Sequence, residues 1–386
     1  MRVVMFSQDP NKLAREMVSE IGRRIGPCIF VAGKPDSNED LNIPNVNYIL
    51  APPYSRQTIK SRMISWMAYT FHALIRVLVL SRRTDLFFFI SSPPFIGVLG
   101  YLANILAQKE YVVLVNDIYP DIAENFGMIR RNGLISRFWR LMNRQIYNHS
   151  KCIITISEEM ARNISDQMSA GHSPKKVIVI PTWVDTKLIK PLLKSDNPFA
   201  IKYKQSDKIT VLYAGNFGNA ADVAIIPKIA GTLKNDARLH FILVGKGEKT
   251  EYIKGLIEEL AIENMTMLPY QPETTLPYML AMADISLVML NPQVKGKSVP
   301  SKTYYYMAAG SAILVICAEG DALERIINKH QCGLSVQSEI DAAKAIERFT
   351  NDERFLQQCK TNSRKTAEMF FDKERCISQF IEALTL

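Results

Sequence analysis

A lysine at the predicted start of a helix is the residue of this chain best suited to binding an anion. The segment Ser298-Val-Pro-Ser-Lys-Thr follows an apolar stretch at 284–290, which predicts a strand. Pro300 and Ser301 favour the first turn and the N-cap of a helix over about residues 302–309. Free amides at such a helix start attract anions, and Lys302 adds a full charge, so the segment predicts a phosphate site. The alternative is a simple cap followed by a solvated lysine.

A second segment with phosphate-binding character is Gly215-Asn-Phe-Gly218, which follows one predicted strand and precedes a predicted helix. Because glycine has no Cβ, the backbone amides of this loop could approach a phosphate closely. Ordinary turns also require glycine. The pair of glycines therefore leaves both interpretations open.

Positive charge is concentrated in the first half of the chain. Residues 1–180 contain 22 Lys and Arg against 14 Asp and Glu, a net charge of +8, whereas the other 206 residues contain 25 against 24, a net charge of +1. Stretches 41–84 and 125–157 each hold six basic residues and no acidic residue. Nucleic acid and an anionic membrane are the usual partners of such a surface. No recognised nucleic-acid-binding motif accompanies the arginines, which favours the membrane.

The apolar stretch 63–80 could be a membrane-spanning helix by its length. Its eight Leu, Ile, Phe and Val residues favour insertion by roughly 0.3–0.6 kcal/mol each, whereas Arg76 opposes it by roughly 2.5–3.5 kcal/mol. His72, Ser65 and Thr70 oppose it further, so a spanning helix is not expected. Two interpretations remain, a helix packed on a sheet or an interfacial amphipathic helix. The apolar face of the latter would hold Trp66, Met67, Phe71 and Leu74.

The elements that must position these residues form an α/β pattern. With 386 residues the chain is too long for one ordinary core, which predicts two domains. Apolar strands alternate with helical stretches in both halves, as in parallel, doubly wound sheets. Strands are expected near 2–6, 28–31, 46–50, 86–90, 112–115, 152–155 and 177–180, and near 210–214, 240–244, 265–268, 285–289 and 312–316.

Such sheets bind ligands at the carboxyl ends of their strands. Ser7 and residues 91–94 and 116–121 should therefore line one crevice in the first domain. The six cysteines are scattered, with no Cys-x-x-Cys pair and no secretory signal before them. We therefore expect reduced thiols, a cytoplasmic location and no structural zinc.

Segments along nearly the whole chain resemble glycosyltransferase family 4, whose members are retaining enzymes of GT-B fold. Residues 298–310 resemble the donor-binding segment of that family. The order and spacing of the segments are similar to the branch that builds bacterial surface polysaccharides such as colanic acid and O-antigen. The other segments are Asp85-Leu-Phe-Phe-Phe-Ile-Ser-Ser-Pro-Pro94, Asn116-Asp-Ile-Tyr-Pro-Asp121, Ile180-Pro-Thr-Trp-Val-Asp-Thr186, Asn197-Pro-Phe199, Tyr213-Ala-Gly-Asn-Phe-Gly218 and Val244-Gly-Lys-Gly247.

The resemblance implies two Rossmann-like α/β domains facing a central cleft. Residues 1–186 would form an acceptor-binding, membrane-facing domain, and the polar stretch 187–208 would be the linker. Residues 209–370 would bind a nucleotide-sugar. The last segment, 371–386, would be a helix that crosses back to the first domain.

The resemblance also implies the composition of the donor site. The diphosphate would lie between the 215–218 loop and the start of the 302–309 helix, and the nucleobase would lie near residues 270–271. The implied donor-binding residues are Gly215, Asn216, Gly218, Tyr270, Gln271, Ser298, Ser301, Lys302 and Tyr305.

Two positions depart from the family pattern. Lys297 and Tyr305 replace two glutamates, the second of which contacts the donor ribose in the family, and Asn216 and Asp222 replace an arginine and a lysine of the first phosphate loop. Members of the surface-polysaccharide branch often lose one of the glutamates. We therefore interpret the departure as a feature of the branch, with the phosphate charge resting on Lys302.

Asp117, at a predicted strand end, is the candidate catalytic residue of the first domain. Its carboxylate could orient an acceptor hydroxyl or stabilise an oxocarbenium-like centre, and its alternative role is to cap the following loop. Asp121 and Glu124 could substitute for it. The sequence has no Asp-x-Asp element and no His and carboxylate cluster with ligand spacing, so a metal-independent reaction is expected.

Together these features predict a retaining glycosyltransferase, peripheral to the cytoplasmic face of the plasma membrane. It would use a nucleotide-sugar donor, UDP-linked, and a lipid-linked saccharide acceptor, with no cofactor and no nucleic-acid partner. A nucleotide-sugar 2-epimerase of the same fold is an alternative, although an epimerase needs no lipid acceptor. A non-catalytic membrane-associated partner of a transferase is another. Measurable UDP-sugar hydrolysis would exclude that last alternative.

Overall fold

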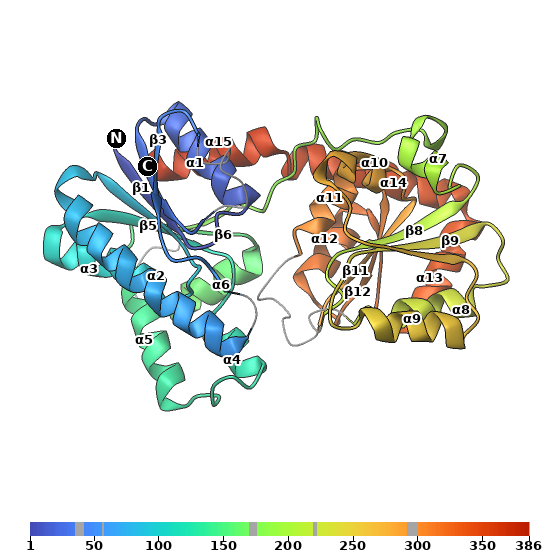
Figure 1. Cartoon of the computed structure of the whole chain (residues 1–386), viewed down its shortest axis with the longest axis horizontal. Helices are drawn as coiled ribbons and strands as arrows, with labels where there is room; N and C mark the ends of the chain where they lie inside the picture. The colour runs from blue at the N-terminus through green and yellow to red at the C-terminus, as the bar shows by residue number, and fades with distance from the viewer. Residues whose placement is uncertain (35–41, 56–57, 170–175, 219–221, 292–299, 386) are drawn as a thin grey trace. The chain divides into compact units, whose positions relative to one another are not determined.

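The computed structural model describes residues 1–34, 42–55, 58–169, 176–218, 222–291 and 300–385. The chain forms two compact units, the first of residues 1–181 and 376–386 and the second of residues 182–375. Each unit has one parallel sheet with helices on both faces (Figure 1).

The sheet of the first unit contains seven parallel strands in the order β3-β2-β1-β4-β5-β6-β7. Strands covered by helices on both faces read as continuous apolar runs, as in Leu86-Phe-Phe-Phe-Ile of β4. The strands are β1 (Val3–Ser7), β2 (Cys28–Ala32), β3 (Val46–Leu50), β4 (Leu86–Ile90), β5 (Glu110–Val115), β6 (Cys152–Thr155) and β7 (Val177–Val179).

Helices cover this sheet on its two faces (Figure 1). On one face α1 (Lys12–Arg24) lies beside the last helix, α15 (Lys373–Thr385), and Arg24 donates to Ser378 Oγ at 3.0 Å. Phe380 of α15 packs on Phe88 of β4, with ring centroids 5.3 Å apart. The other helices are α2 (Ile59–Leu80), α3 (Gly97–Ala107), α4 (Asp121–Asn125), α5 (Leu134–His149) and α6 (Glu158–Gln167).

The second unit repeats this architecture around six parallel strands in the order β10-β9-β8-β11-β12-β13. The strands are β8 (Ile209–Ala214), β9 (Leu239–Val244), β10 (Met265–Leu268), β11 (Ile285–Met289), β12 (Ala312–Ile316) and β13 (Gly333–Val336). The helices are α7 (Pro198–Lys202), α8 (Ile225–Thr232), α9 (Thr250–Glu259), α10 (Leu276–Ala281), α11 (Lys302–Ala308), α12 (Ala322–His330), α13 (Glu339–Asn351) and α14 (Glu353–Phe370).

All twelve strands expected from the apolar runs are present, whereas β13 was not predicted. Residues 187–208, where we expected a linker, lie within the second unit. Two polar side chains hold them there. Asn197 donates to the Tyr278 carbonyl at 2.8 Å, and the Lys194 ammonium bonds the buried Asp284 carboxylate.

Candidate active site

The candidate donor site of the second unit lies where three neighbouring strands end. Strands β8, β9 and β10 run parallel and side by side, so the loops 215–218, 245–247 and 269–271 leave the same edge of the sheet. Helix α11, with Lys302 as its first residue, begins at the same edge. This is the edge at which α/β sheets bind ligands.

Backbone hydrogen bonds join the three loops directly. Gly215 donates to the Val244 carbonyl at 2.9 Å, and Gly245 donates to the Leu268 carbonyl at 2.9 Å. Phe217 donates to the Lys246 carbonyl at 3.2 Å and accepts from the Lys249 amide at 2.9 Å. The loops therefore form one backbone assembly.

Two glycines allow this close approach. A Cβ on Gly245 would lie 1.9 Å from the Gly215 carbonyl oxygen, and one on Gly247 would lie 2.5 Å from the Phe217 carbonyl carbon. Neither contact is sterically possible. The side chain of Asn216 lies at the same junction, since its Oδ1 would be 2.5 Å from a Cβ on Gly247 and 3.2 Å from one on Gly218.

Lys302 supplies the positive charge of this site. Its Nζ lies 3.8 Å from the centroid of the Tyr213 ring and would be 3.4 Å from a Cβ on Gly215. Burial lowers the pKa of Lys302 to about 7, and no carboxylate among the described residues opposes this effect. A partly buried cation without an anionic partner is costly, so this arrangement suits an anion supplied by a ligand.

Two tyrosine hydroxyls fix the backbone around Lys302. Tyr213 donates to the Asn216 carbonyl at 3.1 Å, which closes the 215–218 loop. Tyr306 of α11 accepts from the Ala214 amide at 2.8 Å and donates to the Ala214 carbonyl at 3.1 Å. Helix α11 is therefore attached directly to the end of β8, and the position of Lys302 follows from that attachment.

In the loop after β10, the aromatic ring of Tyr270 is exposed to solvent. Its side chain is 59% exposed, and its hydroxyl donates to the Lys246 carbonyl at 3.4 Å. The neighbouring Gln271 donates to the Pro269 carbonyl at 2.7 Å. An exposed ring held at its hydroxyl end is suited to stacking on a planar base.

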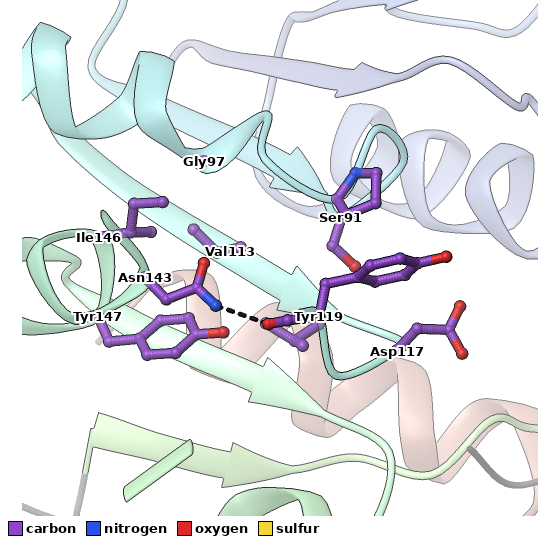
Figure 2. Close-up of a pocket in the computed structure, with 10 residues that line it drawn as sticks. Ser91, Gly97, Val113, Asp117, Tyr119, Asn143, Ile146 and Tyr147 are labelled. Carbon is purple, nitrogen blue, oxygen red and sulfur yellow. Dashed lines mark hydrogen bonds between the residues drawn. The ribbon is translucent and has the colours of Figure 1, made fainter. Parts of the chain in front are cut away.

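In the first unit, a pocket opens at the ends of β4 and β5 (Figure 2). Its shape depends on two hydrogen bonds, from the Asn116 amide to Ser91 Oγ at 3.1 Å and from Asn143 to the Tyr119 carbonyl at 2.7 Å. Figure 2 shows the Asp117 carboxylate and the Tyr119 hydroxyl pointing away from Asn143. The lining residues are Ser91, Pro94, Gly97, Val113, Val115, Asp117, Tyr119, Asn143, Ile146 and Tyr147.

Tyr119 connects this pocket to a cluster of aromatic rings. It stacks on Trp139 of α5 at 5.5 Å and meets Trp66 of α2 edge-on at 6.3 Å, and Phe95 contacts both tryptophans. Burial, and then the charge of Asp117, raise the pKa of Tyr119 to about 12. The Tyr119 hydroxyl therefore stays protonated at neutral pH and can donate a hydrogen bond near Asp117.

An ion-pair network fixes the segment that follows the pocket. The Arg140 guanidinium lies 2.6 Å from Asp121 Oδ1 and 2.7 Å from Glu124 Oε2, and Ser136 also bonds Glu124. The hydrogen bond from Arg140 lowers the pKa of Glu124 to about 2, against the opposing effect of burial. Helix α4 is thereby attached to α5.

Two sequence families match the chain in consecutive parts. The family described as Glycosyltransferase Family 4 matches residues 12–188, and the family described as Glycosyl transferases group 1 matches residues 195–366. These matches coincide with the two sheets. The chain belongs to glycosyltransferase family 4.

Known proteins resemble this chain in sequence and in fold. A probable glycosyltransferase of Pseudomonas aeruginosa, WbjE, is 23% identical over 282 residues, which cover 73% of this chain and 70% of WbjE. The crystal structure of Anabaena Alr3699/HepE in complex with UDP has a TM-score of 0.77 at 14% identity, with full coverage of both chains. A sucrose-phosphate synthase of Thermosynechococcus elongatus also has a TM-score of 0.77, at 14% identity over 99% of this chain and 98% of its own. The glycosyltransferase therefore has the GT-B fold.

The structure of the glycosyltransferase brings most of the predicted donor residues together. Gly215, Asn216, Gly218 and Lys302 meet at the end of β8, and Tyr305 lies one helical turn beyond Lys302. Ser298 and Lys297 lie outside the described residues. Ser301 stands at the N-cap position directly before α11, as expected, but it has helical dihedral angles (φ −57°, ψ −29°) and its side chain makes no capping hydrogen bond.

Three predictions for the first unit need correction. Asp121 and Glu124 cannot readily substitute for Asp117, because Arg140 binds both carboxylates. Trp66 does not belong to an exposed apolar face, because its ring packs in the aromatic cluster. Ser7 does not line the pocket, since it is buried and its hydroxyl donates to the Asp9 carbonyl at 2.9 Å.

Sequence reasoning missed several residues that shape the two sites. Gly245 and Gly247 appeared only in a family segment, and Tyr213, Tyr306 and Tyr119 were given no role. A glycine pair after a predicted strand could have indicated a second loop. Among the residues that the structure describes, no three His, Cys, Asp or Glu side chains form a group that could hold a metal ion.

Proposed function

We propose that this glycosyltransferase transfers a sugar from a UDP-linked donor to a lipid-linked saccharide, with retention of anomeric configuration, in the synthesis of a bacterial surface polysaccharide. The main support for donor binding is the position of the Lys302 ammonium group. It lies against Gly215 at a sheet edge suited to phosphates, and no described carboxylate neutralises it. The structure of HepE in complex with UDP supports a uridine nucleotide.

The reaction would proceed without a metal ion. Lys302 would neutralise the charge that develops on the leaving diphosphate, which is the role that a divalent cation fills in metal-dependent transferases. Transfer should therefore survive EDTA. Loss of transfer in EDTA, followed by its recovery with magnesium or manganese, would contradict both this proposal and the role of Lys302.

In the first unit, Asp117 would act on the acceptor. Its carboxylate and the protonated Tyr119 hydroxyl, neighbours at the pocket, could hold an acceptor hydroxyl by accepting and donating one hydrogen bond each. Asp117→Asn keeps the shape and removes the charge. We expect kcat to fall while the Kd for UDP stays unchanged.

A cytoplasmic position at the membrane completes the proposal. All six cysteines are free and buried, as in proteins of reducing compartments, and the first half of the chain carries a net charge of +8. An anionic membrane would attract this charge and would present the lipid-linked acceptor. Incubation of a labelled UDP-sugar with bacterial membranes should move label into the lipid extract, and NMR of the product should show the donor's anomeric configuration.

The donor proposal is tested by UDP binding to Lys302→Ala. Loss of a charge-assisted contact should weaken binding by about 10- to 150-fold, equivalent to about 1.5–3 kcal/mol. Lys254→Ala is the matched control, because Lys254 lies in the same unit and pairs with Glu251 on an exposed helix. Calorimetric titration should show weak binding only for Lys302→Ala. Equal affinities for the two variants would refute the donor site.

A further inference from the structure

Helix α2 attaches to the first unit by only one stripe of its surface. Ser65, Tyr69, Ala73 and Val77 are buried at intervals of four residues. The Ser65 carbonyl accepts from Gln8 at 2.8 Å, and the Tyr69 hydroxyl donates to the Val31 carbonyl at 2.8 Å. These bonds hold the helix along the sheet, with its opposite side free of the core.

That opposite side is apolar. Residues 60–83 are long and apolar enough to cross a membrane, with a mean hydropathy of 1.5, yet only 17% of the most apolar part is buried. Its exposed side chains follow the helix from Met63 to Val79, a length of about 24 Å. Helix α5 exposes a similar group. The apolar ridge, as we define it, comprises Met63, Ile64, Met67, Phe71, Ile75, Leu78 and Val79 of α2 and Leu134, Ile135, Phe138 and Leu141 of α5.

The two parts of the apolar ridge belong to neighbouring helices. Trp66 of α2 and Trp139 of α5 both pack on Tyr119 and on Phe95, so the helices flank one aromatic cluster. Exposure of the ridge side chains ranges from 44% for Ile75 to 86% for Leu134. Exposed apolar patches of this extent mark binding surfaces.

Exposed cations border the apolar ridge. Stretches 41–84 and 125–157, which contain both helices, include no Asp or Glu. Arg140 does not contribute, because Asp121 and Glu124 neutralise it. The exposed cations are Lys60, Arg82, Arg83, Arg130, Arg131, Arg137 and Arg144.

We propose that the apolar ridge inserts in the plane of an anionic bilayer, with its arginines and lysines on the lipid headgroups. An apolar stripe with a cationic border is the composition of interfacial helices. A second copy of this chain is disfavoured as the occupant, because a symmetric contact would bring two basic borders together. The membrane position was proposed above on the basis of charge. Insertion of these apolar side chains would hold the protein there in addition to charge.

Insertion would bring the acceptor pocket to the bilayer. Tyr119 lines the pocket beside Asp117 and also packs on Trp66 and Trp139, the tryptophans of the two ridge helices. A saccharide on a lipid embedded in the same leaflet could then reach Asp117 while its apolar chain stayed in the membrane. This step rests on the proposed acceptor, whereas the insertion does not.

Flotation of the full chain with phosphatidylcholine and phosphatidylglycerol vesicles tests the insertion. The unaltered protein should float in both 0.1 M and 1 M NaCl, because screening weakens charge contacts but not apolar burial. The double variant Met67→Ser and Phe71→Ser, at two positions that are each 67% exposed, should reduce vesicle affinity by about 10-fold or more per residue. Ile340→Ser in the second unit, 65% exposed, is the matched control and should float normally.

A depth probe supplies the second measurement. Phe71→Trp fluorescence should be quenched by brominated lipids, and Ile340→Trp fluorescence should not. Release of the unaltered protein by 1 M NaCl, together with normal flotation of the double serine variant, would overturn insertion in favour of adsorption by charge. Dimers in sedimentation velocity that the double serine variant abolishes would instead assign the ridge to a second copy.

UDP titration of the same proteins separates this inference from the proposed function. The double serine variant should bind UDP normally, which shows that its fold is intact. Lys302→Ala should float normally. If Lys302→Ala kept UDP affinity while the serine variant lost flotation, the donor proposal would fail and the insertion would stand.

Discussion

The pKa values of two side chains in this glycosyltransferase depend on residues that are close in space. Lys302 would be an ordinary solvated lysine on a free helix, but burial against Tyr213 and Gly215 lowers its pKa to about 7. Glu124 would titrate near 4.5, but the hydrogen bond from Arg140 lowers its pKa to about 2. Each shift leads to a dependence on pH that can be measured.

Donor binding should weaken as pH rises above 7. UDP bound at Lys302, as proposed, would favour the ammonium form, so the fraction of binding-competent protein should fall above the Lys302 pKa of about 7. The Kd should rise by up to about 10-fold per pH unit between pH 7 and 9. Lys302→Arg remains charged in this range and should show no such slope, whatever its affinity. A flat Kd profile for the unaltered protein would contradict the lowered pKa of Lys302.

The lowered pKa of Lys302 also predicts how the stability of the ligand-free protein depends on pH. The pKa of Lys302 is lower in the folded state than in the unfolded state, so the unfolded state binds more protons between about pH 7 and 10.5. This lysine therefore opposes folding most at pH 7 and below. Lys302→Met should raise the melting temperature at pH 7 while it abolishes tight UDP binding. A lower melting temperature would indicate a structural role.

The Arg140 network should protect the first unit against acid. The folded-state pKa of Glu124 is lower than its unfolded value, so its contribution to stability is present above about pH 4.5 and disappears as pH falls toward 2. Arg140→Ala should lower the free energy of unfolding by about 3 kcal/mol at pH 7, since it leaves two carboxylates unpaired. Arg137→Ala, on the exposed side of α5, is the control. Equal urea midpoints for the two variants would contradict the prediction.

Among the secondary-structure elements, the loops after β8, β9 and β10 together form the candidate donor site. Their backbones touch because Gly245 and Gly247 lack side chains, and α11 joins them through the Tyr306 hydroxyl. Neither the 215–218 loop nor helix α11 is positioned by its own sequence alone. A substitution that displaces one of these loops should therefore also displace the other two.

A methyl group at Gly245 should disrupt this assembly. In Gly245→Ala the Cβ would lie 1.9 Å from the Gly215 carbonyl oxygen, so the loops must separate. We expect a loss of stability of several kcal/mol, about the upper range for single substitutions, and no measurable UDP binding. Gly255→Ala in α9 is the control, because no atom outside the local helix backbone lies within 4 Å of its new Cβ, and it should stabilise the protein by about 0.5–1 kcal/mol. Normal UDP binding by Gly245→Ala would refute the loop contact.

At the scale of the whole molecule, the C-terminal segment contributes to the core of the first unit. Residues 376–386 belong to it, and Phe380, Cys376 and Leu384 are buried there. The Cys152 thiol of β6 donates to the Ala383 carbonyl at 3.4 Å. A segment more than 190 residues away in sequence therefore supplies part of the core beneath β4 and β6.

The substitution Phe380→Ala tests whether α15 stabilises the first unit. Phe380→Ala removes the ring that packs on Phe88 and should destabilise the first unit by about 3–5 kcal/mol. Glu382→Ala, an exposed change on the same helix, should have little effect. Urea unfolding followed by tryptophan fluorescence reports mainly the first unit, because Trp66 and Trp139 lie in it and only Trp183 lies in the second unit. Unchanged midpoints for Phe380→Ala would show that α15 contributes little to the core.

The sequence by itself determined the fold class, the family and all the described strands except β13. Strands such as β4 and β12 are runs of apolar residues, and such runs specify buried parallel strands without reference to distant residues. The missed strand β13, Gly333-Leu-Ser-Val, lacks such a run. Lys302 was found for a similar local reason, because a lysine beside a helix start is visible in the sequence.

Only the tertiary structure decided which residues act together. The apolar residues of 63–80 surround the helix, so periodicity did not identify its buried face. Contacts with Phe95 and Tyr119 place Trp66 inward, whereas Met67 is exposed. The partner of Arg140 and the obstruction that requires Gly245 lie on other elements of the chain. Pairing and steric exclusion depend on distances in space, and residues distant in sequence acquire those distances only when the sheets form.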